Sequence, residues 1–184
     1  MTITIAGTGT GKINELTVPT AAGSVLGSGT NYPLNIDASA TAESLKIDSS
    51  GRIFAPNRVM FYARKASGSG DVTGVFTAQF DTKIFDIGNG FNTSTGLYTA
   101  PVAGVYYFCL SYFCDNGASG RIDYEKNGVI VQRCGREAAL SGFDCRSSSL
   151  IIDLAVNDTI EGAVTSGNMH INSACNFFSG FLLG

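Results

Sequence analysis

A glycine-rich run near the N-terminus is the first part of the sequence that could do chemistry, because loops of this kind bind phosphate. The run reads Gly7-Thr-Gly-Thr-Gly11-Lys12. A nucleotide-binding phosphate loop also needs a glycine five residues before its Gly-Lys pair and a Ser or Thr after the lysine. Ala6 and Ile13 stand at those two positions. We therefore interpret the run as a flexible Gly/Thr arm and not as a nucleotide site.

Nucleophilic catalysis would depend on His170, the only histidine in the chain. A Ser or Cys nucleophile needs such a base to remove its proton. His170 lies in the alternating segment 168–172, which is typical of a strand, and the sequence has no Gly-x-Ser-x-Gly nucleophile elbow. We interpret His170 as a surface or interface residue and predict that the protein is not an enzyme.

The cysteines offer neither a zinc site nor a clear disulfide framework. The five are Cys109, Cys114, Cys134, Cys145 and Cys175. No two have the C-x-x-C spacing of a zinc ligand pair, and an odd, unevenly spaced set is not typical of paired disulfides. We expect reduced thiols that act as small apolar side chains in a protein assembled in the cytosol, with a Cys134–Cys145 bridge as the one exception.

Charge is sparse, at 15% of residues with a net charge of −3, so the chain has no electrostatic footprint for nucleic acid. Some arginines lie in predicted loops and strand ends, where they could bind an anionic glycan, although ordinary solvated charge explains them better. They are Arg121, Arg133, Arg136 and Arg146.

Composition and patterning predict an all-β protein. The chain has 184 residues, 23 of them glycine, and its strand-like runs alternate with Gly/Asn/Ser/Asp turns without a long 3.6-residue period. No apolar run reaches the length of a membrane span, so we expect no membrane insertion. The first residues lack the features of a signal peptide, so we do not expect the sequons at Asn92 and Asn157 to be glycosylated.

The segment 105–113 is rich in β-branched and aromatic residues and predicts a strand with no polar face. Tyr106 and Phe108 fall on one side of it, whereas Tyr107 and Phe113 fall on the other. A strand that is apolar on both faces is buried twice. One face then belongs to the core of a sandwich, and the other most simply meets another subunit.

Around this strand, aromatic residues and glycines follow a recognisable spacing. The positions are Phe80, Asp86, Phe91, Tyr98, Gly104, Tyr106 and Phe108. They resemble the globular head of complement component 1q, a trimeric jelly roll of the tumour-necrosis-factor-like superfamily, with Tyr98 where the second Phe of the family pattern belongs and Leu110 in place of the final aromatic. The run 124–128 is similar to the family's Lys-Asn-Gly hairpin, 154–160 to its hydrophobic–Asp–hydrophobic strand start, and 178–183 to its last strand.

The resemblance covers residues 57–184 and implies a homotrimeric jelly-roll β-sandwich of about ten strands. We expect its motif residues in the core or the trimer interface, namely Phe80, Asp86, Phe91, Tyr98, Gly104, Tyr106, Phe108, Phe178, Gly180 and Phe181. No cofactor is expected. Some relatives bind calcium at loop ends, where Asp115, Asn116 and Asp144 could supply oxygens, but turn formation explains these residues better.

Residues 1–56 differ from the head and are predicted to form an extended anchoring arm. Their scattered Ile, Leu and Val do not suit a solvated linker, and they lack the glycine at every third position that a collagen stalk requires. The segment 44–54 reads as an alternating strand, a Ser-Ser-Gly turn and a return strand, which predicts a hairpin. This stretch resembles the connector that precedes terminal domains in structural proteins of tailed bacteriophages.

Together these resemblances predict a virion structural protein of a tailed phage, assembled in the host cytoplasm. It would be a trimeric fibre, spike or decoration protein whose residues 1–56 bind other virion proteins of the capsid, neck or tail. One alternative is a receptor- or glycan-binding tip that contacts the host surface. A second is a secreted recognition module of the complement type. The two ends of the head are expected at its base, with the loops 115–120 and 135–145 at the opposite end.

Overall fold

The structure is a computed structural model of the chain. It describes residues 24–25, 35–36, 45–47, 49–65, 71–73, 76–77, 80–114, 120–134, 144–170 and 174–184. The chain divides into two compact units, Met1–Pro56 and Asn57–Gly184.

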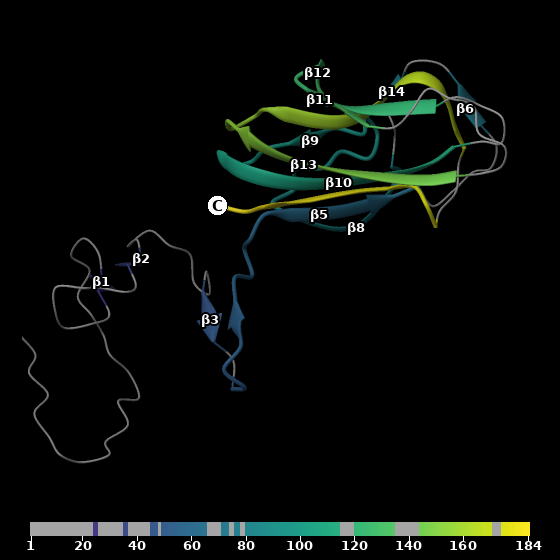
Figure 1. Cartoon of the computed structure of the whole chain (residues 1–184). Helices are drawn as coiled ribbons and strands as arrows, with labels where there is room; N and C mark the ends of the chain where they lie inside the picture. The colour runs from purple at the N-terminus through teal and green to yellow at the C-terminus, as the bar shows by residue number, and fades with distance from the viewer. Residues whose placement is uncertain are drawn as a thin grey trace, which may run out of the picture. The chain divides into compact units, whose positions relative to one another are not determined.

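The described part of the first unit consists of two short antiparallel pairs (Figure 1). One pair joins β1 (Ser24–Val25) to β2 (Asn35–Ile36), and the other joins β3 (Lys46–Ile47) to β4 (Ile53–Phe54). The second pair confirms the hairpin predicted at 44–54. Its turn contains Gly51 at a φ of 77°, in the left-handed region that glycine enters without strain.

The second unit is a sandwich of two antiparallel sheets, which are seen edge-on in Figure 1. The first sheet has the order β13 (Asp144–Leu154), β10 (Gly104–Cys114), β15 (Phe177–Leu182), β5 (Met60–Arg64) and β8 (Thr82–Ile87). The second has β12 (Val129–Cys134), β11 (Gly120–Lys126) and β14 (Thr159–His170), with β6 (Asp71–Thr73), β7 (Phe76–Thr77) and β9 (Tyr98–Thr99) paired along β14. The described residues form no helix. The predicted all-β jelly roll is therefore confirmed.

Aromatic rings fill the space between the sheets. Tyr106 and Phe108 of β10 are completely buried, as the alternation of that strand predicts. Phe178 of β15 lies at the centre, with its ring centroid 5.0 Å from that of Phe61 and 5.8 Å from that of Phe108. Beside it, a Cβ added to Gly180 would come within 2.5 Å of the Phe108 ring. Glycine at this position is therefore required for the rings to approach β15 closely.

Two carboxylates form hydrogen bonds at the ends of strands in the sandwich. Asp86 at the end of β8 accepts hydrogen bonds from the backbone N–H groups of Gly90 and Phe91, both at 3.1 Å, and an ion pair from Lys83 at 2.9 Å. These bonds turn the chain after β8 back over the core. They explain why an acid stands among the aromatic motif residues: its oxygens satisfy backbone donors that the loop cannot pair otherwise.

The second carboxylate, Asp158, joins the two motifs that the sequence places 30 residues apart. Asn127 and Gly128 form the β11–β12 turn with φ values of 52° and 74°, as expected for a tight hairpin. The Asn127 amide donates to Asp158 at 2.8 Å and accepts the backbone N–H of Thr159 at 2.8 Å. Lys126 pairs with Asp158 at 2.7 Å. The hairpin is thereby attached to the start of β14.

The two ends of the head lie together, as predicted. The backbone N–H of Leu182 donates to the carbonyl of Val59, just before β5, at 3.0 Å. The N–H of Val105 donates to the carbonyl of Gly184 at 2.8 Å. The start of β5 and the C-terminal end of β15 therefore occupy one end of the sandwich, where Figure 1 marks the C-terminus.

Tyr98, which stands in place of a Phe, carries a buried hydroxyl without a hydrogen-bond partner among the described residues. It lies near the hydroxyl of Tyr106, which donates to the carbonyl of Val102 at 2.7 Å. Burial is also the main cause of the raised pKa of Tyr98. An unpaired buried hydroxyl destabilises a fold, since it loses its water without compensation.

We expect Tyr98→Phe to leave the free energy of unfolding unchanged or to raise it by up to about 1 kcal/mol, because it removes only an unpaired hydroxyl. The matched change Tyr106→Phe removes a hydrogen bond and should lower it by about 1 kcal/mol. Urea unfolding of both variants at one protein concentration measures the difference. A larger loss for Tyr98→Phe than for Tyr106→Phe would contradict this account.

Asp158 makes the stability of the head depend on pH. The hydrogen bond from Lys126, followed by those from Asn127 and the N–H of Ala155, lowers the pKa of Asp158 from 3.8 to about 2. A carboxyl whose pKa is lower in the folded state stabilises the fold above its unfolded pKa, and this contribution is lost as the pH falls toward the folded value.

We therefore expect Asp158→Asn to have a lower free energy of unfolding than the unmodified protein at pH 7. This difference in free energy should become smaller as the pH falls from 4 to about 2. Denaturant unfolding over this pH range measures it. Asp153→Asn is the control, because Asp153 is an exposed acid on β13. If the difference in free energy of unfolding stays constant with pH, Asp158 does not act through its charge.

Candidate functional site

The most unusual surface of the head is the outer face of the first sheet. Strand register places one residue from each of its five strands in line across this face, and all five are apolar. We call this line the apolar row; it consists of Ile151 (β13), Tyr107 (β10), Phe181 (β15), Met60 (β5) and Ile87 (β8). In a sheet that faces water, this side would carry polar residues.

Side-chain contacts make the row continuous in its middle. The rings of Tyr107 and Phe181 lie 5.2 Å apart between centroids. Toward its ends the row is open to solvent, with Ile151 at 65% and Ile87 at 38% exposure. These apolar side chains are not buried in the core of their own protomer, so the row is a surface suited to contact with another protein.

The next line across the same face continues the apolar surface along β5 and β8. The ring of Tyr62 lies 6.1 Å from that of Phe85 and 5.8 Å from that of Phe177. Toward β13 this line becomes small and polar, with Ser179, Cys109 and Ser149 in register. Along this line the aromatic residues therefore lie on β5 and β8, and the small residues on β15, β10 and β13.

The sequence-predicted residues separate into different environments. The rings and glycines of the motif lie in or beside the core. Gly180 admits the Phe108 ring, and Gly104 leaves room for the Leu182 side chain and the Gly184 carbonyl. The buried rings are those of Phe80, Phe91, Tyr98, Tyr106, Phe108 and Phe178. Asp86 orders the loop after β8. Phe181 alone of the group lies on the outward face, at 36% exposure. Only Phe181 therefore belongs to the candidate surface.

Most of the candidate surface was missed by sequence reasoning. Tyr107 was placed on the second face of its strand, but Met60, Ile87 and Ile151 were not singled out. A weak signal exists in Ile151-Ile152, where two consecutive isoleucines cannot both face one core. Which outward residues line up depends on the register between strands, and this is not readable within a single strand.

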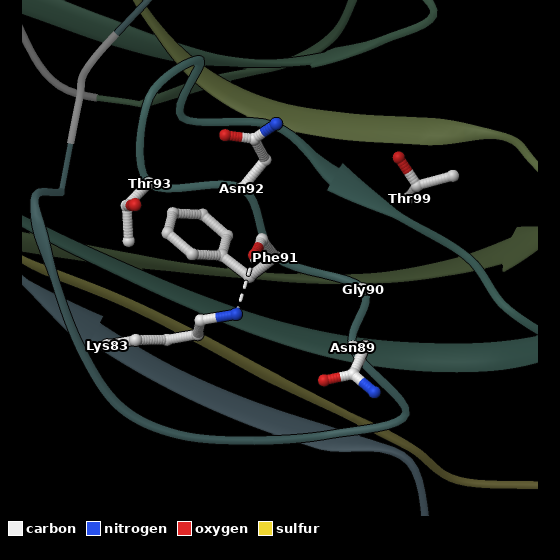
Figure 2. A pocket seen from close by; sticks show the side chains of 7 residues that line it. All are labelled: Lys83, Asn89, Gly90, Phe91, Asn92, Thr93 and Thr99. Carbon is white, nitrogen blue, oxygen red and sulfur yellow. Dashed lines mark hydrogen bonds between the residues drawn. The ribbon is translucent and has the colours of Figure 1, made fainter.

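A second, smaller feature is a hollow beside the loop after β8 (Figure 2), lined by Lys83, Asn89, Gly90, Phe91, Asn92, Thr93 and Thr99. The Lys83 ammonium bonds to Asp86 at 2.9 Å and to the Phe91 carbonyl at 3.2 Å. The positive charge of Lys83, which could have attracted an anion, is therefore already paired with Asp86. We interpret the hollow as a polar loop surface and not as a ligand site.

The other candidates for chemistry receive little support. His170 at the end of β14 lies edge-on to the ring of Phe113, with 5.5 Å between centroids. Arg121 is held inside the second sheet, where its Nε donates to Asp123 and Thr165, both at 3.0 Å. It is therefore not available as part of a glycan-binding patch. Arg133 remains exposed on β12.

Several predictions fall outside the described residues: the run from Gly7 to Lys12, Asp115, Asn116, Arg136, and most of the loops 115–120 and 135–145. The side chain of Asp144 is also outside them. Within the described part of the chain, no group of three His, Cys, Asp or Glu residues could hold a metal ion. Among the residues that the structure describes, there is no helix that could cross a membrane.

The expected Cys134–Cys145 bridge is wrong, because both residues are free thiols. Cys134 is buried at the end of β12, in the second sheet, where its sulfur lies 3.8 Å from the Gln132 carbonyl. Cys145 is exposed on β13, in the first sheet. The sandwich places the two cysteines in different layers.

Comparisons with known proteins agree with this fold. The family model of the C1q domain matches residues 60–183. Among solved structures, the globular domain of zebrafish complement 1qA has a TM-score of 0.55 at 18% identity and covers 69% of this chain and 98% of its own. Eiger TNF from S. frugiperda has a TM-score of 0.56 at 12% identity, covering 70% and 94%. At these identities the two structures show the fold alone.

Curated relatives include complement C1q and tumor necrosis factor-related protein 9B of Homo sapiens and protein 9 of Mus musculus. Each is 32% identical over 91 residues, covering 48% of this chain and 26% of the relative. The chain thus spans about a quarter of the length of these relatives. They are complement-related animal proteins, so the expected location in a phage virion is wrong. The match of the C1q model to residues 60–183 shows that the chain belongs to the C1q domain family.

Proposed function

We propose that the chain is an extracellular recognition module of the complement type that works as a homotrimer, assembled through the apolar row. The row is the observation that carries the proposal. It extends over all five strands of the first sheet, and its end residue Ile151 is 65% exposed in the single chain. Domains of this family commonly form homotrimers and are typically recognition modules and not enzymes.

A closed ring of three suits this surface better than a pair. In such a ring each protomer presents one edge of the face to the next, so the contact need not be self-complementary. The face is indeed asymmetric, with the aromatic side chains of Tyr62 and Phe85 toward β8 and the small side chains of Cys109 and Ser149 toward β13. Large rings of one protomer can then fill the space left by small residues of the next.

Aromatic residues in the middle of the row would supply most of the association energy. Tyr107 and Phe181 each lose a large apolar area when covered, and aromatic anchors near the centre of an interface dominate binding. Trimer formation also serves recognition, because three linked copies bind a repeated ligand with greater avidity than one copy does. The location outside the cell is inferred from the complement-related character of the curated relatives.

We expect the unmodified protein to be a trimer at micromolar concentration and Ile151→Asp to be a monomer with the same fold. The aspartate replaces a side chain that is 65% exposed in the single chain, so folding is preserved, but it would bury a charge in the trimer. Val129→Asp on β12 is a matched control at 66% exposure on the other sheet and should remain trimeric. Sedimentation equilibrium gives the masses, and circular dichroism checks the fold.

Two results would refute the proposed assembly: a monomeric mass for the unmodified protein, or a trimeric Ile151→Asp variant. A variant that is unfolded by circular dichroism would be replaced by Ile151→Ser, which removes the apolar group without adding charge.

Recognition and location are tested separately from assembly. On an array of extracellular proteins and glycans, we expect the trimer to bind at least one surface about 100-fold more tightly than folded Ile151→Asp, because avidity multiplies weak contacts. An antibody against the chain should detect it in the medium of the cells that produce it. No binding by the trimer would contradict the recognition role, and detection only inside cells would contradict the location.

A further inference from the structure

Two cysteines from separate parts of the sequence meet at one end of the first sheet. Cys145 is the second residue of β13, and Cys175 lies two residues before the start of β15. The sulfur of Cys145 is 4.0 Å from the carbonyl oxygen of Cys175. Both residues are free thiols.

The backbone holds the two cysteines on either side of β10. Cys145 is in register with Phe113 of that strand. On the other side, the completely buried Asn176 fastens the turn that carries Cys175: its side-chain oxygen accepts the N–H of Phe113 at 2.9 Å, and its amide donates to the carbonyl of His170 at 2.8 Å. The approach of the cysteines therefore depends on strand pairing and a buried amide, and not on side-chain rotation alone.

The side chain of Cys145 crosses β10 to reach Cys175. Its sulfur lies 3.6 Å from the hydroxyl of Ser111, a small residue that leaves room above the strand. The thiol of Cys175 lies close to that of Cys145. Burial and then this contact raise the pKa of Cys175 to about 11. A disulfide needs its sulfurs about 2 Å apart and its Cα atoms no more than about 7 Å apart, so the turn that carries Cys175 must close on β13 for the bridge to form.

The other described thiols lack such a partner. Cys134 is buried with its sulfur near the Gln132 carbonyl, and burial raises its pKa. Cys109 is half-buried on the outer face, and burial raises its pKa as well. Cys145, in contrast, is exposed, so a dissolved oxidant can reach it first.

We propose that Cys145 and Cys175 are an oxidisable pair that closes a disulfide across β10, with a small-molecule disulfide such as glutathione disulfide as the oxidant. The deprotonated sulfur of Cys145 attacks one sulfur of glutathione disulfide, whose S–S bond breaks and releases one glutathione thiolate. The sulfur of Cys175, after losing its proton, attacks that of Cys145 and expels the second glutathione. The protein loses two electrons and two protons, and one glutathione disulfide becomes two glutathione molecules.

The bridge would enclose all of β14 and nearly all of β13 in one covalent loop. Closing a loop of this length restricts the unfolded chain and so stabilises the fold. The bridge would also fix the turn before β15, the strand that contributes Phe181 to the apolar row. This inference does not depend on the trimer or on the proposed location, since the contact lies within one chain.

The test is to equilibrate the full chain with glutathione disulfide, alkylate the remaining thiols, and digest with trypsin without reduction. Cleavage after Arg136 and Arg146 places Cys145 in peptide 137–146 and Cys175 in peptide 147–184. We expect these two peptides to be joined, with neither cysteine alkylated. The melting temperature should rise by about 5 °C on oxidation and return on addition of reductant.

Variants separate this pair from other thiols. Cys145→Ser and Cys175→Ser should each abolish the joined peptide and the rise in melting temperature, whereas Cys109→Ser should keep both. Three results would each overturn the proposal: alkylation of both Cys145 and Cys175 after oxidation, a link from either of them to another cysteine of the chain, or a link only between two chains.

Discussion

The head depends on one constraint: its central strand β10 is apolar on both faces and must be covered on both. One face, with Tyr106 and Phe108, is covered by the second sheet and by the rings around Phe178. The other face, with Tyr107 in the apolar row, is not covered by the described residues of the same chain. The constraint that builds the core therefore also leaves an apolar face open on the outside, and this face is the basis of the proposed association.

Polar groups define where the apolar layers end. Asp86 binds backbone donors of the loop after β8, and Asp158 joins the β11–β12 turn to β14. Their carboxylates satisfy donors that would otherwise be left unpaired at the ends of strands, which is the requirement for any loop that lies against an apolar core. In this family pattern the aromatic residues therefore mark the packed core, and the acids mark the ends of the strands that form it.

The phage interpretation shows how a correct local prediction can support a wrong function. The hairpin at 44–54 exists, with β3 paired to β4. The inference from that hairpin to a virion protein rested on resemblance of a short connector, and a short hairpin is compatible with many proteins. The 91-residue match to complement-related proteins is much longer and leads in another direction. The secreted recognition module, first considered as an alternative, agrees better with these relatives.

The sequence by itself determined the sheet class and the buried face of β10, because side-chain alternation and turn residues act over a few neighbouring positions. It also indicated that Asn127 and Asp158 matter, without showing that they bind each other. Only the tertiary structure decided which outward residues of five strands form the apolar row, and that Cys145 approaches Cys175 and not Cys134. Both depend on the register and layer of strands distant in sequence, which many residues fix together and no single segment encodes.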